Sequence, residues 1–489
     1  MSLLKNRLDS IGYGCILVDE MLMNAKVNDE FIAALRGNQI DDNAFFIYAS
    51  GTTGSPKGVL LNYRGVINHA NAKIKLLSLS NDVKICLSFN VGFVASTWQI
   101  ITPIYLGGQL IIFRKELIKN PYAFFTMLQT ECLSFVVITP HTLRGYLEYI
   151  KHRDEKLPLN HIRQIVLTGE IIDAILVNEF YREYSNIQLV NAYGQTECSD
   201  DIYHYVIPIT SDNSNVPIGK PIFNMYGCVL DESFNEVWDD ETGELYIGGV
   251  GVATGYMNNE KLSREKFVFI PERMDRFYRT GDIVKRNLNG DLIYVGRKDN
   301  QVKIRGHRIE LEEVETYLKS YPDINQAIAL QTELNGINII QCVFTSNVVI
   351  NKRILFEFFS KHMPKYMIPS KLIQISEFVY TPNGIINRKY DYSSLAVNDE
   401  MDSVNGKLSD LQIRIFEIIK PFLTTEEMVP NMAIEMSGID SISFVRMVIQ
   451  LEDACAFEFD DHKLVLSEFP TMLEIVKYVE KKIKTNNSM

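Results

Sequence analysis

Short apolar runs alternate with longer amphipathic stretches through the first half of the chain, and this alternation constrains the fold more than any other feature. The apolar runs ICLSFNVGFV, GQLIIF, LSFVVIT and IRQIVLTG are typical of strands, and the stretches ELIKNPYAFFTMLQTE and AILVNEFYREYSN are typical of helices. Strands and helices that alternate in this way form a parallel sheet covered by helices. We therefore predict a large α/β unit over residues 1–298.

Two smaller units are expected after it. Residues 299–390 contain the strand-like segments INQAIALQ and INIIQCVFT and the helix-like segment ILFEFFSKHM, which together predict a small α+β unit. Residues 391–409 lose periodicity and gain Ser, Asn and Asp, as linkers do. Three segments with apolar residues at helical spacing then predict a helical bundle over residues 410–485.

Composition excludes several classes of partner. The 489 residues suffice for about three units. A net charge of -12 and a pI near 5.3 argue against binding to nucleic acid or to anionic membranes. No apolar run approaches the roughly 18 residues needed to span a bilayer, and the N-terminus carries charges where a signal peptide is apolar. We expect a cytoplasmic protein.

The segment YASGTTGSPKG, Tyr48 to Gly58, combines three glycines, several hydroxyl side chains and one lysine. Glycine lets the backbone approach a ligand closely, while hydroxyls and an ammonium can bind phosphate oxygens. The preceding run IDDNAFFIYA predicts a strand, so the loop follows a strand end, where nucleotides usually bind. A plain linker of Gly, Ser and Thr stays open as the alternative for this segment alone.

This segment resembles the phosphate loop of the adenylate-forming superfamily, specifically the adenylation domains of nonribosomal peptide synthetases. Further segments resemble motifs of that family and follow in its order: NAYGQTE, GELYIGGVGVATGY, YRTGD, GRKDNQVKIRGHRIE, MPKYMIP and TPNG. The resemblance implies an acid-thiol ligase. Such an enzyme activates a carboxylic or amino acid as an acyl-adenylate with ATP and Mg²⁺, and then forms a thioester on 4′-phosphopantetheine.

The resemblance also assigns roles to individual residues. It implies that the phosphates are held by Ser50, Gly51, Thr52, Thr53, Gly54 and Lys57. It places the nucleoside against Asn191, Ala192, Tyr193, Gly194, Asp282, Tyr294 and Arg297. The catalytic residues would be Thr196, Glu197 and Lys303, with Glu197 as the Mg²⁺ ligand and Asp299 as the hinge.

Ordinary structural roles remain as alternatives for three of these motifs. A Thr-Glu pair usually begins a helix, and Thr-Gly-Asp is common in turns. The charged KIRGHR segment can be a solvated strand end.

The acyl pocket is predicted by the same matching. Its residues would be Val94, Ala95, Trp98, Val137, Val166, Thr168, Ala192, Asp200 and Asp201. Val94 stands where relatives have the aspartate that binds the substrate α-amino group, which implies a substrate that lacks this group or holds its amine elsewhere. Asp200 and Asp201 resemble pockets that take diamino acids, because paired carboxylates can bind a distal ammonium. Acidic residues of a surface turn are the alternative.

Ser441 lies in GIDSI, at the predicted start of a helix, where serine is commonly a plain capping residue. The segment also resembles the attachment motif of peptidyl carrier domains, which implies that Ser441 carries phosphopantetheine. The partners would then be a phosphopantetheinyl transferase and downstream synthetase or tailoring enzymes.

Two departures from the family pattern predict impaired adenylation. Ile385 follows Asn-Gly where relatives have a lysine, and an isoleucine cannot neutralise charge that develops on the reacting oxygens. Residues 7–20 resemble a segment well inside the family's large domain, so we expect a large unit that is N-terminally short and that another chain could complete. The alternative function is a non-catalytic carrier or scaffold protein loaded in trans at Ser441.

Overall fold

The computed structural model describes residues 39–486, apart from residues 51–55, 115–116, 119, 154–155, 210–215, 239–240, 335–336, 382–385, 398–408, 424–438, 440, 456, 461–462, 464–467 and 470. The chain divides into two compact units, Met1–Asp42 and Asn43–Met489. All named helices and strands belong to the second unit. None of the described helices is both long and apolar enough to cross a bilayer.

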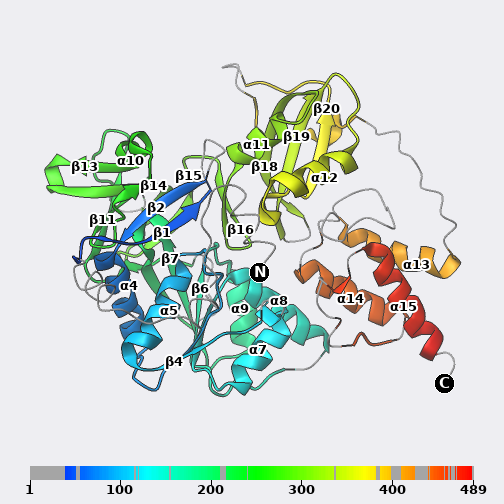
Figure 1. Cartoon of the computed structure of the whole chain (residues 1–489), viewed down its shortest axis with the longest axis horizontal. Coiled ribbons are helices and arrows are strands. Elements are labelled where there is room, and N and C mark those ends of the chain that lie inside the picture. The colour runs from blue at the N-terminus through cyan, green and yellow to red at the C-terminus, as the bar shows by residue number, and fades with distance from the viewer. Residues whose placement is uncertain are drawn as a thin grey trace, which may run out of the picture. The chain divides into compact units, whose positions relative to one another are not determined.

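A five-stranded sheet carries much of the site (Figure 1). Its strands, in spatial order, are β5 (Phe135–Ile138), β6 (Gln164–Thr168), β7 (Gln188–Gln195), β8 (Asp200–Ile207) and β9 (Lys220–Pro221). The strands β5, β6 and β7 are parallel, as are the separately paired β3 (Lys84–Cys86) and β4 (Gln109–Ile111). The predicted parallel pairing is confirmed for these strands. The next strand, β8, is antiparallel to β7, because the short helix η1 (Thr196–Cys198) turns the chain directly back.

Three helices pack on this sheet: α7 (Pro121–Thr130), α8 (Pro140–Arg153) and α9 (Ala174–Glu183). Asn120 and Asp173 cap α7 and α9, since each side chain accepts a hydrogen bond from a backbone N–H of the first turn. The ring of Phe125 on α7 stacks on that of Tyr146 on α8 with centroids 4.0 Å apart, and both side chains are fully buried. This aromatic contact holds α7 and α8 together.

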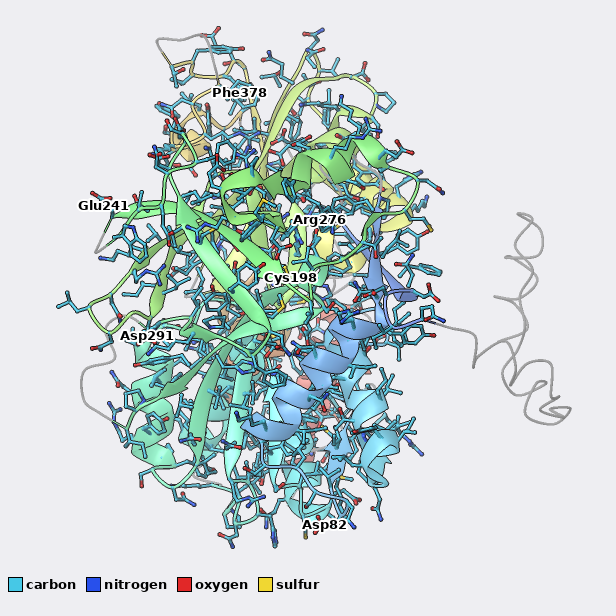
Figure 2. The ribbon with its side chains drawn as sticks, turned by 90° about the vertical axis from the view of Figure 1, so that its left-hand side faces the viewer. Asp82, Cys198, Glu241, Arg276, Asp291 and Phe378 are labelled. Atoms are coloured by element: carbon cyan, nitrogen blue, oxygen red, sulfur yellow. The ribbon has the colours of Figure 1, made fainter. Side chains whose placement is uncertain are left out.

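Two more helices, α4 (Tyr63–Leu76) and α5 (Ala95–Leu106), contact each other and bury His69, Lys73 and Trp98. Two further sheets belong to residues 43–297, which we call the large part. One is antiparallel, with β10 (Met225–Leu230), β11 (Thr242–Gly249), β14 (Asp275–Arg286), β13 (Phe267–Ile270) and β15 (Leu292–Arg297). The other joins β1 (Asn43–Ala49), β2 (Lys57–Asn62) and β12 (Gly255–Tyr256), and α10 (Glu260–Lys266) lies between β12 and β13 in the chain. Figure 2 shows Cys198, the last residue of η1, among densely packed side chains, whereas Asp82 lies at the edge of the view.

The segment after Lys298 forms the predicted α+β arrangement. A hairpin of β16 (Gln301–Ile304) and β17 (His307–Glu310) leads into α11 (Leu311–Lys319). A sheet of β18 (Ile324–Leu334), β19 (Ile337–Ser346) and β20 (Lys371–Ile375) follows, with α12 (Lys352–His362) between its last two strands in the chain.

The C-terminal segments predicted to be helical form α13 (Asp410–Ile419), α14 (Ser441–Cys455) and α15 (Met472–Asn486). Phe416, Met447 and Ile475, one from each helix, are fully or nearly fully buried in one apolar cluster. Ser409 and Gln412 form a capping box at the start of α13. The guanidinium of Arg446 on α14 also donates a hydrogen bond of 2.7 Å to Glu148 on α8.

Candidate active site

A cavity of about 530 Å³ lies where β7, the β14–β15 edge and the β16–β17 hairpin meet. The predicted nucleotide and catalytic residues that line it are Asn191, Ala192, Tyr193, Asp282, Tyr294, Arg297 and Lys303. These residues come from four strands that are up to 112 positions apart in the sequence (Asn191 to Lys303). The structure therefore brings together the residues that the sequence motifs singled out separately.

Asp282 is the centre of a hydrogen-bond network at the cavity wall. Its buried carboxylate accepts hydrogen bonds from the Tyr193 hydroxyl, from Gln195 Nε2 at 2.6 Å and from the Arg297 guanidinium. Burial, reinforced by the neighbouring Asp282, raises the pKa of Tyr193 well above its ordinary value, so the tyrosine stays a neutral donor. Asp282 Oδ2 accepts two of these bonds and Oδ1 accepts one, so Oδ1 keeps a lone pair that can accept a bond from a ligand hydroxyl.

The hairpin β16–β17 brings positive charge to the same place. Lys303 Nζ lies 3.4 Å from the carbonyl oxygen of Gly194 and 5.4 Å from the Tyr193 ring centroid. Burial lowers the pKa of Lys303. Gly306 at the hairpin tip has a φ of +76°, and a Cβ atom there would come within 2.7 Å of Thr139 Cγ2. The tip therefore packs closely on the loop that follows β5, and a solvated strand end is the wrong description of this segment.

A second charged group joins the ends of the glycine-rich loop to Glu197. Lys57, the first residue of β2, places its Nζ 3.2 Å from Glu310 Oε1 and 3.9 Å from Glu197 Oε1. The Arg308 guanidinium donates to Glu197 Oε2 at 2.6 Å, and the Tyr256 hydroxyl donates to Oε1 at 2.7 Å. Burial alone would raise the pKa of Glu197, but Arg308 and Lys57 outweigh it and hold this pKa at about 2.

The predicted acyl-pocket residues divide between two apolar clusters. Trp98, Val137, Val166 and Ala192 belong to one cluster, and Val94 packs against another. Ala95 and Thr168 are also buried. The Trp98 indole is fully buried, and its Nε1 has no hydrogen-bond partner among the described residues.

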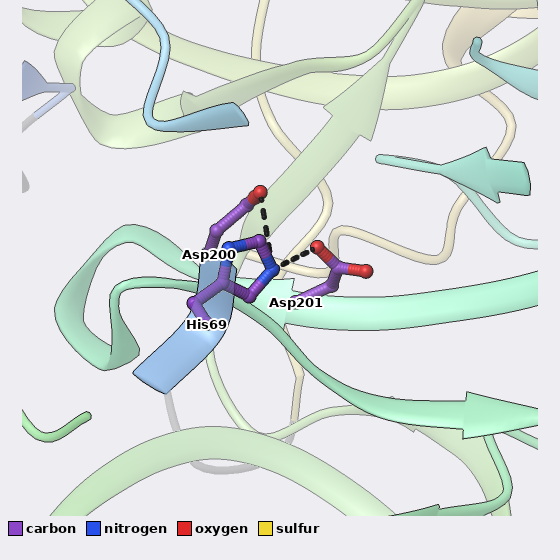
Figure 3. A group of neighbouring side chains, drawn as sticks. All are labelled: His69, Asp200 and Asp201. Atoms are coloured by element: carbon purple, nitrogen blue, oxygen red, sulfur yellow. Dashed lines mark hydrogen bonds and ion pairs between the residues drawn. The ribbon is translucent and has the colours of Figure 1, made fainter. Parts of the chain in front are cut away.

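Asp200 and Asp201 are buried at the start of β8, so the surface-turn alternative is wrong. Asp201 accepts bonds from the Lys73 ammonium, from His69 Nε2 at 2.8 Å and from His204 Nε2 at 2.9 Å. Figure 3 shows the imidazole of His69 between the two carboxylates, with Asp200 Oδ2 at 3.6 Å. Burial raises the pKa of Asp200 well above its ordinary value, and the negative Asp201 beside it acts in the same direction.

His69, Asp200 and Asp201 also present ligand atoms within 4.8 Å of one another, as a metal site would. The Lys73 ammonium already supplies a positive charge to Asp201, and a metal ion would have to displace it. A distal ammonium of a substrate would likewise find Asp201 occupied, whereas Asp200 Oδ2 accepts no hydrogen bond within the described part of the chain.

Comparison with known proteins identifies the family. The sequence model described as "AMP-binding enzyme" matches residues 9–257, just over half of the chain. The chain belongs to the AMP-binding enzyme family. It is 30% identical to tyrocidine synthase 3 of Brevibacillus parabrevis over 449 residues, which are 91% of this chain and 7% of that protein. It is 29% identical to tyrocidine synthase 1 of the same organism over 96% of this chain and 42% of that protein. The chain therefore spans less than half the length of these relatives.

Among solved structures, the chain is similar to holo-PA1221, an NRPS protein containing adenylation and PCP domains bound to a vinylsulfonamide inhibitor. The TM-score is 0.75 at 21% identity, with 91% of this chain and 74% of that chain covered. At this identity the similarity shows the fold alone. The mixed α/β fold of an adenylation domain is thereby confirmed.

The structure also locates four other residues that were predicted from the sequence. Ser50 is buried and donates a hydrogen bond of 2.8 Å to the backbone carbonyl of Arg308, and Thr196 begins η1. Asp299 lies two residues after the end of β15 and accepts hydrogen bonds from Arg297, and Ser441 is the first residue of α14. The described residues do not include Gly51, Thr52, Thr53, Gly54, Ile385 or residues 7–20.

Several residues of the site received no role from the sequence. Glu170 lines the cavity directly after β6, and burial raises its pKa to about 7. Its place after an apolar strand and a glycine was the one available clue. Lys73 lies on a helix 128 residues before its partner Asp201, and Glu310 lies 253 residues after its partner Lys57. Partners this far apart in the sequence cannot be paired from local patterns.

Proposed function

We propose that this chain uses ATP and Mg²⁺ to convert a carboxylic or amino acid into an acyl-adenylate, and then transfers the acyl group to 4′-phosphopantetheine on Ser441. The observation that carries the proposal is the convergence of Asn191, Tyr193, Asp282 and Lys303 on one cavity. A flat aromatic and amide wall, a carboxylate oxygen with a free lone pair and an ammonium suit adenine, ribose and phosphate in turn.

The residues present fit the two cofactors. Tyr193 would face the adenine, Asp282 would accept the ribose hydroxyls, and Lys57 with Ser50 would bind the β- and γ-phosphates. Glu197 is ionised and buried and would hold Mg²⁺, which supplies charge neutralisation at the phosphates when bound. Neutralising the charge that develops on the phosphate oxygens is the main requirement of adenylation.

The orientation of the β16–β17 hairpin bears on the second half-reaction. In the family that the sequence resembles, the small domain turns about a hinge after adenylation and brings this hairpin to the pantetheine tunnel. Lys303 beside Gly194 and Gly306 against Thr139 are consistent with that second orientation. The hinge would be Asp299.

The domain boundaries are part of the proposal. Residues 1–298 and 299–390 would be the two adenylation subdomains, 391–409 the linker and 410–485 a peptidyl carrier domain. This division is supported by the position of Ser441 at the start of α14 and by the fold similarity to a protein with adenylation and PCP domains. A phosphopantetheinyl transferase and downstream synthetase or tailoring enzymes would be its partners in the cytoplasm.

The test has two measurements. ATP–pyrophosphate exchange across a panel of carboxylic, α-amino and ω-amino acids should show acid-dependent exchange, and Asp282→Ala should abolish it. Intact-mass analysis after incubation with coenzyme A and a broad phosphopantetheinyl transferase should show one modification. Ser441→Ala should remove this modification, whereas the matched control Ser443→Ala should keep it. Modification without exchange by any acid would instead support the non-catalytic carrier.

A further inference from the structure

Lys73, on α4, places an ammonium in the interior of the large part, where no motif of the sequence predicted a charge. Its side chain is 0% exposed, and its Nζ donates a hydrogen bond to Asp201 Oδ2. The Trp98 ring centroid lies 5.6 Å from Nζ, and His204 Nε2 lies 3.4 Å from it. A carboxylate and an aromatic face are the groups with which proteins bind the ammonium of a ligand. Lys73 thus occupies an ammonium site that its own chain provides.

This ammonium site adjoins the wall of the proposed reaction cavity. Asp201 on β8 pairs with Gly194 on β7, and the carbonyl oxygen of Gly194 lies 3.4 Å from Lys303 Nζ. Ala192, which lines the cavity, belongs to the same apolar cluster as Trp98. The buried ion pair is therefore one strand away from the cavity, beside residues that the sequence assigned to the acyl pocket.

The charges of this group cancel at neutral pH. Burial lowers the pKa of His69 and that of His204, the latter to about 4, so both imidazoles are neutral. Burial raises the pKa of Asp200 well above its ordinary value, whereas for Asp201 the Lys73 charge outweighs burial and holds the pKa well below it. One cation and one anion remain. A second ammonium would require Asp200 to ionise beside Asp201, and like charges oppose this.

We infer that Lys73 is a specificity-determining residue: its ammonium fills the subsite in which Asp201 would otherwise bind a cationic group of the substrate, so the acid that this chain activates is uncharged at its far end. The inference rests on the proposed function, with Asp201 in the acyl pocket. It replaces the diamino acids that the paired carboxylates implied. Trp98 Nε1 and Asp200 Oδ2 have no partner among the described residues, so a hydroxyl end would find a donor and an acceptor.

The first test is ATP–pyrophosphate exchange by the full chain with propionate, butyrate, pentanoate and the ω-hydroxy and ω-amino derivative of each. The unaltered chain should use an uncharged acid about 10-fold better than the ω-amino acid of the same length. A preference of the unaltered chain for the ω-amino acids would overturn the inference, and this comparison requires no variant.

Three variants then test the role of the Lys73 side chain. Lys73→Ala removes the ammonium and leaves room for another, so it should shift the preference toward ω-amino acids by about 10-fold. Lys73→Met removes the charge but fills the space, and should not shift it. Lys75→Ala, on the exposed side of the same helix, is the matched control and should keep the original preference. Equal preferences in Lys73→Ala and Lys75→Ala would overturn the inference.

A second measurement requires no catalysis. Ethylammonium is small enough for the space that Lys73→Ala leaves, and it should raise the Tm of this variant by about 2 °C relative to sodium at equal ionic strength. The unaltered chain and the double variant Lys73→Ala/Asp201→Asn, which lacks the buried anion, should show no such rise. An equal rise in the single and double variants would overturn the ammonium site. A rise confined to Lys73→Ala, beside no exchange by the unaltered chain with any acid, would overturn the proposed function and leave the ammonium site standing.

Discussion

The buried Lys73–Asp201 pair offers the strongest test of how the large part is stabilised. Lys73 is 0% exposed, its ammonium is bound to Asp201, and it lies 5.6 Å from the Trp98 ring centroid. The substitution Lys73→Met keeps most of the apolar stem and removes the charge. Asp201 then remains buried with only its two histidine partners, His69 and His204.

The magnitude follows from the contacts that remain. Removing one partner of a buried ion pair typically costs about 3–5 kcal/mol. Because His69 and His204 still donate to Asp201, we expect the lower end, about 3 kcal/mol of unfolding free energy at pH 8.

The cost should shrink toward pH 5. In the unaltered chain, two causes lower the pKa of His204 to about 4: burial, which is the larger, and the charge of Lys73. Lys73→Met removes one of the causes that lower this pKa, so the folded variant binds a proton at His204 more readily than the unaltered chain does. As the pH falls from 8 to 5, the unaltered chain loses more unfolding free energy by keeping His204 neutral than the variant does, and the difference between the two shrinks.

Urea unfolding followed by tryptophan fluorescence is the assay. Of the two tryptophans, Trp98 lies beside the network, while Trp238 is 56% exposed and reports little on burial. Lys75→Met on the exposed side of the same helix is the matched control and should cost less than about 0.5 kcal/mol. Equal costs for Lys73→Met and Lys75→Met, or a Lys73→Met cost that is the same at pH 5 and pH 8, would refute the reasoning.

Two further predictions concern the proposed site. Ile385→Lys should raise the rate of adenylate formation by about 10²-fold with little change in MgATP affinity, because the added charge acts chiefly in the transition state. Single-turnover kinetics measures the rate and calorimetry measures the affinity. An unchanged rate of adenylate formation would contradict the prediction. Burial raises the pKa of Glu170 to about 7. Ionisation of this side chain should therefore lower the unfolding free energy as the pH rises from about 4.5 to 7. Since its side chain keeps some contact with solvent in the cavity, Glu170→Gln should gain about 1–2 kcal/mol at pH 8 and nothing at pH 4. Thermal unfolding at the two pH values measures this, and a gain of equal size at both would exclude the titration.

The sequence predicted those parts of the fold that depend on local pattern. Apolar runs bounded by turn residues became β5 and β6, and amphipathic periodicity located α9, α12 and α14. Each signal comes from residues within one element, where burial of a face sets the spacing of apolar side chains.

Tertiary pairing carried no comparable signal. From the sequence alone, Asp200 and Asp201 could line a substrate pocket or lie in a surface turn. The structure buries both, and the partner that makes burial of Asp201 possible is Lys73 on the distant helix α4. Arg308 was part of a recognised motif, yet its contact with Glu197 depends on how β17 docks on the large part. Such pairs are decided by desolvation and geometry in the folded state, and neither leaves a local pattern.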